Sequence, residues 1–336
     1  MKQISSQNPF AVNTWSVRMV ESTLQRYTLN DALWHYEHGL QVMAIQKAAE
    51  ITGEARYLHF VSDWIDAFVQ PDGEICTYRM DDFNLDQINP GKLLFQPYRK
   101  TGAERYRKAL GLLREQLKQQ PRTHSGGFWH KKIYPHQIWL DGTYMAGPFL
   151  AEYARCFDEP ELLEDAIDQI LMIEERARDP KTDLLYHAWD ESKQQRWADP
   201  ITGCSQYFWG RAVGWYMMAL VDVLDHLPKE QARRPALVAI LERTARALVR
   251  VQDEETGLWH QILDLPDRQG NYLEASASAM FVYAFARGVH EGYLAQDFLF
   301  SARRGYHGLL ENLIKIDAQG WLTLEKVCGG AGLGGE

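Results

Sequence analysis

The chain has 336 residues, of which 46% are hydrophobic and 24% are charged, so it is long enough to bury a large core. Its formal net charge of −9 excludes a general electrostatic attraction to nucleic acid or to an acidic membrane surface. We therefore expect a globular protein that binds neither nucleic acid nor membrane. Local arginine or lysine side chains would have to bind any anionic ligand.

The four cysteines lie far apart, at positions 76, 156, 204 and 328, and no two form a Cys-x-x-Cys pair. This spacing supports neither a zinc site nor a compact disulfide framework, and it favours a reducing compartment. Residues 1–30 contain no basic segment followed by an apolar run, and no stretch has 18 continuous apolar residues. We therefore expect a cytoplasmic protein. Aromatic residues make up 12% of the chain, and many lie between the periodic segments, where they suit the stacking of sugars.

Apolar residues recur at helical spacing along the chain, and Gly or Pro residues end several of the periodic segments. The pattern predicts eleven helices, at residues 10–28, 35–52, 54–70, 88–101, 104–119, 137–157, 160–177, 207–227, 234–252, 273–291 and 297–315. There is no run of alternating strands. The sequence therefore predicts an all-α protein.

Two internal repeats indicate how these helices are arranged. The string Thr-Gly-Glu-Ala-Arg-Tyr at residues 52–57 has a counterpart at 101–106, and in both places a glycine would end one helix just before the next begins. An aromatic–histidine pair recurs in the loops, as Trp129-His130, Tyr186-His187 and Trp259-His260. A repeat near 50 residues with two helices per unit is typical of stacked helical hairpins.

We expect the hairpins to close into a toroid, an (α/α)6 barrel that forms a single domain over residues 1–336. The tight turns would lie at one end of the barrel and the functional loops at the other. A ring of six hairpins needs twelve helices, whereas the periodicity predicts eleven, so we expect the last helix to be missing from this chain. The glycine-rich residues 329–335 resemble an active-site loop.

Asp141 is the one acidic residue in the apolar and aromatic stretch 136–149. Ionised carboxylates are seldom buried without a partner. A helix cap or a hydrogen-bonded core aspartate is the simplest interpretation of an isolated Asp. The small residues Gly142, Ala146 and Gly147 favour instead a helix end that opens into an aromatic-walled cavity. There the carboxyl would have a raised pKa and donate a proton.

Further polar side chains occur at equivalent places in other repeats. Asp86 precedes a predicted helix, so it is either an N-terminal cap or a second carboxylate that faces Asp141 and raises the pKa of one of the pair. His130 and Lys131 lie beside aromatic residues, and His187 has the equivalent place one hairpin later. No two of these histidines are four residues apart on a helix, and their aromatic context suits sugar hydrogen bonding, so we expect no metal.

Arg211 lies between Trp209 and Trp215 at the start of a predicted helix. A surface salt bridge is one explanation. An arginine framed by small and aromatic residues more often binds a carboxylate through its planar guanidinium. Ser276 and Ser278 open the next predicted helix and would offer hydroxyls at the same rim.

Four segments together resemble the unsaturated rhamnogalacturonyl hydrolases of glycoside hydrolase family 105: Leu85–Asn89, His136–Met145, Trp209–Trp215 and Ser276–Met280. The similarity runs from about residue 10 to the end, and Trp-Leu-Asp-Gly-Thr-Tyr-Met at 139–145 is its most specific part. The family has an (α/α)6 barrel, in agreement with the hairpin repeat, and its pattern continues past the glycine-rich loop into a final helix. Gly210, Ala212 and Val213 depart from the family pattern around Arg211.

The resemblance implies hydration of the C4=C5 double bond of a Δ4,5-unsaturated galacturonic acid at the non-reducing end of a pectin fragment. A rhamnose-containing product would be released, and no cofactor would be needed. Asp141 would be the catalytic acid and base, Asp86 would tune it or hold sugar hydroxyls, and Arg211 would bind the substrate carboxylate. The other expected substrate-binding residues are His187, His130, Lys131, Trp139, Trp209, Trp215 and Tyr36.

Several alternatives stay open. The sequence is also compatible with an unsaturated glucuronyl hydrolase that acts on another lyase-derived disaccharide. It is likewise compatible with an ordinary glycosidase in which Asp86 and Asp141 are the acid and the base. A sugar epimerase would instead use His130, His187 and His260, and a sugar-binding protein would have no activity. Fold alone decides none of these. We expect a small unsaturated oligosaccharide as partner and a monomer or weak homodimer.

Overall fold

The computed structural model describes residues 14–333. In this part of the chain eleven α-helices overlap the eleven predicted ranges, although only residues 95–101 of the range predicted at 88–101 are α-helical: α1 (Trp15–Arg26), α2 (Tyr36–Thr52), α3 (Ala55–Phe68), α4 (Phe95–Thr101), α5 (Glu104–Gln119), α6 (Leu140–Phe157), α7 (Pro160–Ala177), α8 (Gly210–His226), α9 (Arg234–Arg250), α10 (Ala275–His290) and α11 (Phe298–Asn312). Four short 3-10 helices accompany them: η1 (Leu29–Asp31), η2 (Met80–Asp82), η3 (Leu85–Gln87) and η4 (Asn89–Leu94). Residues 10–13 of the first predicted helix lie outside the described residues.

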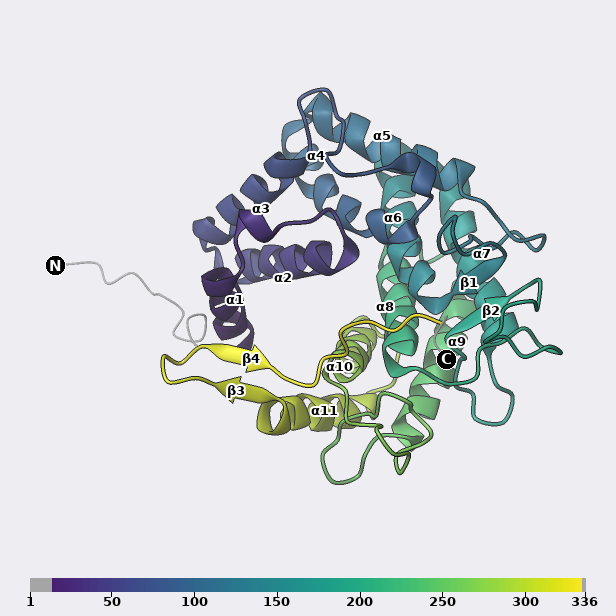
Figure 1. Ribbon diagram of the computed structural model, residues 1–336. Helices are drawn as coiled ribbons and strands as arrows, with labels where there is room; N and C mark the ends of the chain where they lie inside the picture. The colour runs from purple at the N-terminus through teal and green to yellow at the C-terminus, as the bar shows by residue number, and fades with distance from the viewer. Residues whose placement is uncertain (1–13, 334–336) are drawn as a thin grey trace.

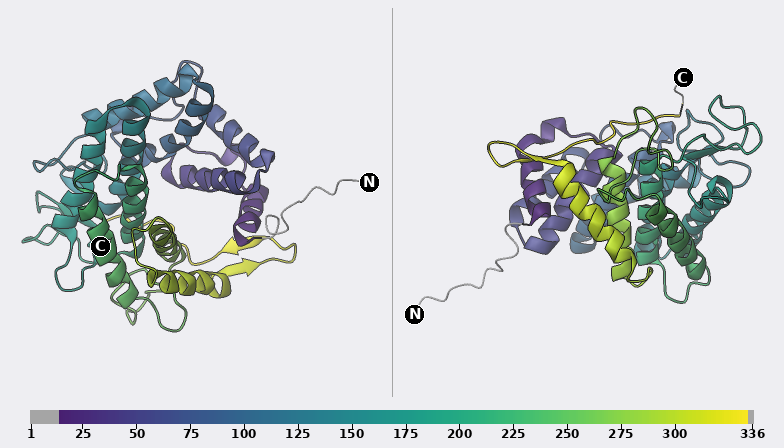
Figure 2. Two further views of the ribbon diagram at one scale, coloured as in Figure 1. Left: turned by 180° about the vertical axis from the view of Figure 1, so that it is seen from behind. Right: turned by 90° about the horizontal axis from the view of Figure 1, so that it is seen from below.

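The helices form a ring in two layers (Figures 1 and 2). Helices α2, α6, α8 and α10 face the centre, and α3, α5, α7, α9 and α11 lie outside them. The sequence explains this division, because a helix that is apolar on all sides must be enclosed. Fourteen of the seventeen residues of the inner helix α8 are buried, against eight of the eighteen in the outer helix α7. The predicted toroid of helical hairpins, an (α/α)6 barrel, is confirmed.

Tight turns join each of the first inner helices to the outer helix that follows. Gly53 ends α2 and Gly102 ends α4, both in the left-handed conformation, with φ of +74° and +64°. In both turns a threonine hydroxyl, of Thr52 or Thr101, accepts a hydrogen bond of 3.2 Å from the amide two residues later. The 49-residue repeat in the sequence is therefore a repeated turn. The long connections lie at the other end of the ring (Figure 2, right).

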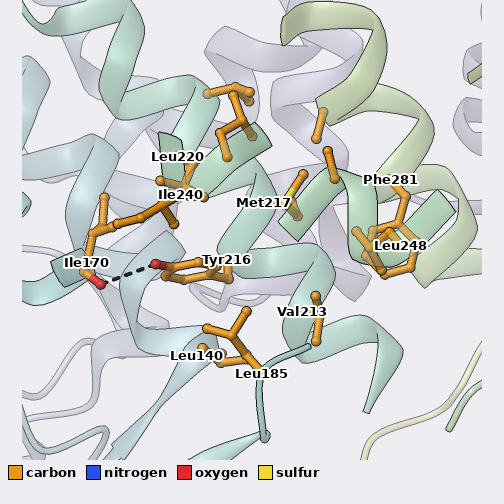
Figure 3. Packing of buried hydrophobic residues seen from close by; sticks show 14 of the residues in the cluster. Leu140, Ile170, Leu185, Val213, Tyr216, Met217, Leu220, Ile240, Leu248 and Phe281 are labelled. Atoms are coloured by element: carbon orange, nitrogen blue, oxygen red, sulfur yellow. Dashed lines mark hydrogen bonds between the residues drawn. The ribbon is translucent and has the colours of Figure 1, made fainter. Parts of the chain in front are cut away.

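A hydrophobic core fills the space between α6, α7, α8, α9 and α10 (Figure 3). Leu140, Met217, Leu248 and Phe281 are fully buried there, and burial of each such side chain contributes about 1.5–3 kcal/mol. The buried hydroxyl of Tyr216 also has a partner, because it donates a 3.2 Å hydrogen bond to the carbonyl oxygen of Ile170. This packing fixes the ends of the inner helices relative to one another.

The prediction of a helix from residue 137 is wrong at its start. Residues Gln137–Trp139 form strand β1, which pairs antiparallel with β2 (Ala188–Asp190), and α6 begins only at Leu140. His136, with φ of +64°, turns the backbone immediately before β1. All three residues of β1 are buried, so its hydrogen bonds to β2 satisfy backbone groups that have no access to water. Similarly, α8 begins at Gly210 and not at residue 207.

The chain after α11 forms a two-stranded hairpin, β3 (Ile314–Ile316) with β4 (Leu322–Leu324), followed by an extended segment. Figure 1 shows this segment crossing the mouth of the ring. The amide of Cys328 donates to the carboxylate of Glu274 at 2.9 Å and anchors the segment to the start of α10. Within residues 14–333, every helix is too short or too polar to cross a lipid bilayer.

Candidate active site

One backbone hydrogen bond recurs at the loop end of the barrel. The residue that opens an inner element donates its amide to a carbonyl oxygen of the long loop that follows the next outer helix. The three pairs are Leu85 to His130 at 3.1 Å, Leu140 to His187 at 3.0 Å and Gly210 to Gln261 at 2.7 Å. The next residues along the chain are Asp86, Asp141 and Arg211. Three predicted site residues therefore occupy equivalent positions around one mouth.

Asp141 and His187 form a direct contact. The pairing of Trp139 with Ala188 at the end of the β1–β2 ribbon brings the start of α6 beside the residue before β2. His187 Nε2 lies 3.0 Å from Asp141 Oδ2. The side chains are 4% and 13% exposed, respectively, so the carboxylate is almost enclosed yet accessible from the mouth.

The pKa of Asp141 differs from the prediction. Burial would raise it, but the charge and hydrogen bond of His187, together with the charge of His130, outweigh burial and hold the pKa of Asp141 below its ordinary value. The predicted raised pKa is thus wrong for the free protein. No local pattern around Asp141 indicates that an imidazole 46 residues away donates to this carboxylate.

Asp86 has a different set of neighbours. Lys131 Nζ lies 2.6 Å from its Oδ2, His130 Nε2 lies 3.4 Å from its Oδ1, and His35 Nε2 lies 3.7 Å from its Oδ2. Burial lowers the pKa of His130, although the charges of Asp86 and Asp141 both oppose this effect. The interpretation of Asp86 as a plain helix cap misses these contacts, and the sequence analysis did not identify His35.

Trp139 and Trp215, two of the predicted substrate-binding residues, are both nearly buried. Trp139 is 7% exposed and stacks on the ring of His130 at 4.7 Å and on that of Tyr134 at 4.9 Å. These contacts hold the ring of His130 in place, and they leave little of the Trp139 ring open for a sugar to stack on. Trp215 is 2% exposed and packs between Tyr36 and Tyr144.

Arg211 is nearly buried at the start of α8. Its Nη1 donates to the carbonyl oxygen of Cys328 at 2.5 Å, and its guanidinium lies 5.0 Å from the ring of Trp209. The charge of Arg211 also reaches Tyr36. Burial, with the charges of Glu37 and Asp86, nevertheless raises the pKa of Tyr36 well above its ordinary value. Arg211 is therefore bonded to the C-terminal segment, and its charge acts on Tyr36, a predicted substrate-binding residue.

A cavity of about 540 Å³ adjoins this cluster. It is lined by His187, Arg196, Trp197, Ser205, Gln206, Tyr207, Trp209, Gln261, Ile262, Arg268, Ala331, Gly332 and Leu333. The lining contains two arginines and no acidic side chain. Arg196 and Arg268 come from loops without helical periodicity, which is why sequence analysis did not single them out. The predicted role of the glycine-rich segment near an active site is consistent with its place here.

The third aromatic–histidine pair is out of register with the other two. The Asp179 amide donates to the Leu184 carbonyl, and the Asp253 amide makes the same bond to Leu258. These two bonds align residue 179 with 253 and residue 184 with 258, so the counterpart of His187 is Gln261. Gln261 also lines the cavity. His260 lies one position earlier, and its charge acts on Asp253.

Several buried polar atoms at this mouth have no hydrogen-bond partner among the described residues. They are His130 Nδ1, Trp209 Nε1, Arg211 Nε and Gln261 Oε1. Buried polar atoms in native proteins are nearly always paired with protein, water or ligand. A hydroxyl-rich, anionic ligand would supply partners to this set. Ser276 and Ser278, in contrast, bind the carboxylate and carbonyl of Glu274.

Comparisons with known proteins show the family and the fold. The family profile described as Glycosyl Hydrolase Family 88 matches residues 13–336. A solved structure of a glycoside hydrolase from family 105 of C. acetobutylicum has a TM-score of 0.93 and 45% identity, over 96% of this chain and 90% of that chain. Unsaturated rhamnogalacturonyl hydrolase YesR of Bacillus subtilis is 31% identical over 271 residues, 78% of this chain and 72% of YesR. Protein Atu3128 of Agrobacterium fabrum is 42% identical over 197 residues, 57% of this chain and 82% of that protein.

Proposed function

The chain belongs to the glycosyl hydrolase family 88 group and to glycoside hydrolase family 105 within it, and on that premise we propose that it removes a Δ4,5-unsaturated galacturonate from the non-reducing end of rhamnogalacturonan fragments. The observation that carries the proposal is the Asp141–His187 pair at 3.0 Å, where His187 lines a cavity without acidic side chains and contacts Trp209, the ring over which Arg211 lies. The similarity to YesR, an unsaturated rhamnogalacturonyl hydrolase, supports the choice of sugar.

The reaction follows from the chemistry of the substrate. Its ring is a vinyl ether conjugated to a carboxylate, so a proton added at C4 leaves an oxocarbenium-like centre at C5. Water adds at C5, the resulting hemiketal opens, and the rhamnose-containing product leaves from C1. Asp141 donates the proton to C4 and then accepts one from the attacking water. No covalent intermediate with the protein is formed.

The low pKa of free Asp141 imposes a condition on this mechanism. The carboxyl is ionised at neutral pH in the free protein, so it must take up a proton when substrate binds. A substrate carboxylate near the mouth and the expulsion of water both raise the pKa of Asp141. Arg211, whose buried Nε has no hydrogen-bond partner among the described residues, binds the substrate carboxylate. This ion pair offsets part of the repulsion between the substrate carboxylate and Asp141.

Asp86 serves a different purpose in this proposal. Lys131 and His130 lie 2.6 and 3.4 Å from its carboxylate oxygens, and this group binds the hydroxyls of the uronate ring. His187 fixes the orientation of the Asp141 carboxyl. Trp209, which borders the cavity, stacks against the sugar that follows the uronate.

An unsaturated glucuronyl hydrolase is the second candidate. Galacturonate and glucuronate differ at C4, and the double bond removes that stereocentre. The uronate ring itself therefore gives the protein little to distinguish. Selection between the two substrates falls to the cavity beyond His187, lined by Trp197, Tyr207 and Arg268.

The test follows the ultraviolet absorbance of the conjugated alkene in the unsaturated rhamnogalacturonan disaccharide. Wild-type protein removes the absorbance, and the isosteric variant Asp141→Asn does not. The glucuronyl disaccharide, assayed in parallel, ranks the two candidates by kcat/KM. Failure of folded wild-type protein to consume either compound would contradict the proposal.

A further inference from the structure

Two histidines and a glutamate from three loops meet at the outer end of the β1–β2 ribbon. His124 lies in the loop after α5, His136 immediately precedes β1, and Glu191 immediately follows β2. One ligand atom from each lies within 4.8 Å of the others. This is the one such group of His, Cys, Asp and Glu side chains in the described part of the chain. It contains none of the residues assigned to the proposed active site.

The carboxylate of Glu191 is held in place before any ligand arrives. The amide of His124 donates to its Oε2 at 2.7 Å, and the amide of Ser125 donates to its Oε1 at 3.2 Å. Glu191 is thus an oriented carboxylate, as a metal ligand should be.

The two imidazoles are also placed close to this carboxylate. His124 Nδ1 lies 2.8 Å from Glu191 Oε2, and the planes of the two imidazole rings are within 8° of parallel. His136 has a left-handed backbone, with φ of +64°, which is uncommon for a residue with a Cβ atom. Its carbonyl oxygen accepts a 3.0 Å bond from the Glu191 amide, so the backbone ties these two ligands together.

We propose that His124, His136 and Glu191 bind one divalent first-row transition-metal ion of the zinc class. The ion takes the place of the proton now shared by His124 Nδ1 and Glu191 Oε2, and water completes a tetrahedral site. Two imidazoles with one carboxylate suit zinc, cobalt or nickel, whereas calcium and magnesium take oxygen ligands.

The place of this site in the fold suggests what the ion does. The β1–β2 ribbon has the metal ligands at its Gln137–Asp190 end and the proposed catalytic pair at its Trp139–Ala188 end. Three strand residues, a length of about 10 Å, separate the two ends. An ion that joins the loop after α5 to both strands would fix the ribbon that positions Asp141 and His187. Its role is structural, since three protein ligands at the rim do not reach the cavity that adjoins His187.

Zinc titration against a chromophoric chelator tests the proposal. All proteins carry Cys76→Ser, because Cys76 is an exposed thiol that would bind zinc by itself. The expected result is one zinc ion per chain and a raised Tm on zinc addition. His124→Gln, at a side chain that is 88% exposed, should fold normally and weaken zinc binding at least tenfold. His136→Asn keeps a residue that tolerates the left-handed conformation and should do the same.

His290→Ala is the matched control. His290 is also exposed and lies 3.8 Å from a glutamate, Glu291, but its pair lacks a third ligand. Its loss should leave zinc affinity and the Tm shift unchanged. With cobalt, the visible absorption of a tetrahedral complex should appear in the wild-type background and be lost in His124→Gln. Less than one zinc ion per chain, or equal affinities in His124→Gln and His290→Ala, would overturn the proposal.

Discussion

Asp86 and Asp141 occupy equivalent positions in neighbouring hairpins, yet their surroundings differ. Each follows a residue whose amide donates to the carbonyl oxygen of a loop histidine. The Asp86 side chain is 6% exposed and has Lys131, His130 and His35 within 4 Å. The Asp141 side chain is 13% exposed and bonds His187 alone. The repeat thus provides the same backbone position twice, and the side chains around it pair one carboxylate with an ammonium and two imidazoles and the other with a single imidazole.

The largest loss of activity should come from replacing Asp141, the carboxylate that is paired with His187. Asp141→Asn keeps the shape and an acceptor for His187 but eliminates the acid, so kcat should fall about 10³-fold, within the range of general acid–base catalysis. Far-ultraviolet circular dichroism should be unchanged. A variant that retained a tenth of wild-type activity would remove Asp141 from its proposed role.

Asp86→Asn should act on both activity and stability. It leaves Lys131 and His130 without their anion, so kcat/KM should fall about tenfold to a hundredfold, because substrate hydroxyls lose a positioned group. Unfolding in urea should show a loss of about 1–3 kcal/mol. The double variant Asp86→Asn/Lys131→Met should recover part of this loss, since no unpaired ammonium remains. If the two substitutions proved additive, the ion pair would not be the stabilising contact.

Arg211→Lys should raise KM about tenfold and change kcat little. An ammonium cannot reproduce a planar guanidinium that binds both the Cys328 carbonyl and a substrate carboxylate. Arg268→Lys, at the outer part of the cavity, is the matched control and should raise KM less. Equal effects at the two positions would argue against Arg211 as the carboxylate-binding residue.

His187→Gln should change the pH dependence. His187 holds the pKa of Asp141 below its ordinary value, and the reaction needs the protonated acid. In wild type kcat/KM should therefore fall as pH rises above the low pKa of free Asp141. Without the His187 charge that pKa rises, so the descending limb should move to higher pH. Rate profiles with superimposable limbs would show that Asp141 is not the titrating group.

The smallest effect should be at His260. His260→Ala should leave kcat/KM within about twofold of wild type, because Gln261, not His260, lines the cavity. Gln261→Ala should weaken substrate binding more. A large loss on His260→Ala would revive the epimerase interpretation, in which the barrel histidines carry the chemistry.

Local patterns predicted the fold well and the site in part. Periodicity located eleven helices, and the Thr-Gly repeats marked turns that depend on neighbouring residues only. Asp86, Asp141 and Arg211 were recognised because a charge in an apolar stretch is conspicuous at short range. Local patterns could not predict which distant segments of the chain pair with each other. The β1–β2 ribbon, the bond between Gly210 and Gln261, and the contact between Asp141 and His187 all join residues that are 46 or more positions apart.

The order of two events under single-turnover conditions tests the central claim most directly. In the proposed reaction Asp141 protonates C4 first, so the alkene must disappear no later than the rhamnose-containing product appears. Stopped-flow absorbance follows the alkene, and chromatography of acid-quenched samples follows the released sugar. Alkene loss that precedes or coincides with sugar release is the predicted result. Sugar release ahead of alkene loss would mean that the glycosidic bond is cleaved directly, and it would contradict hydration by Asp141.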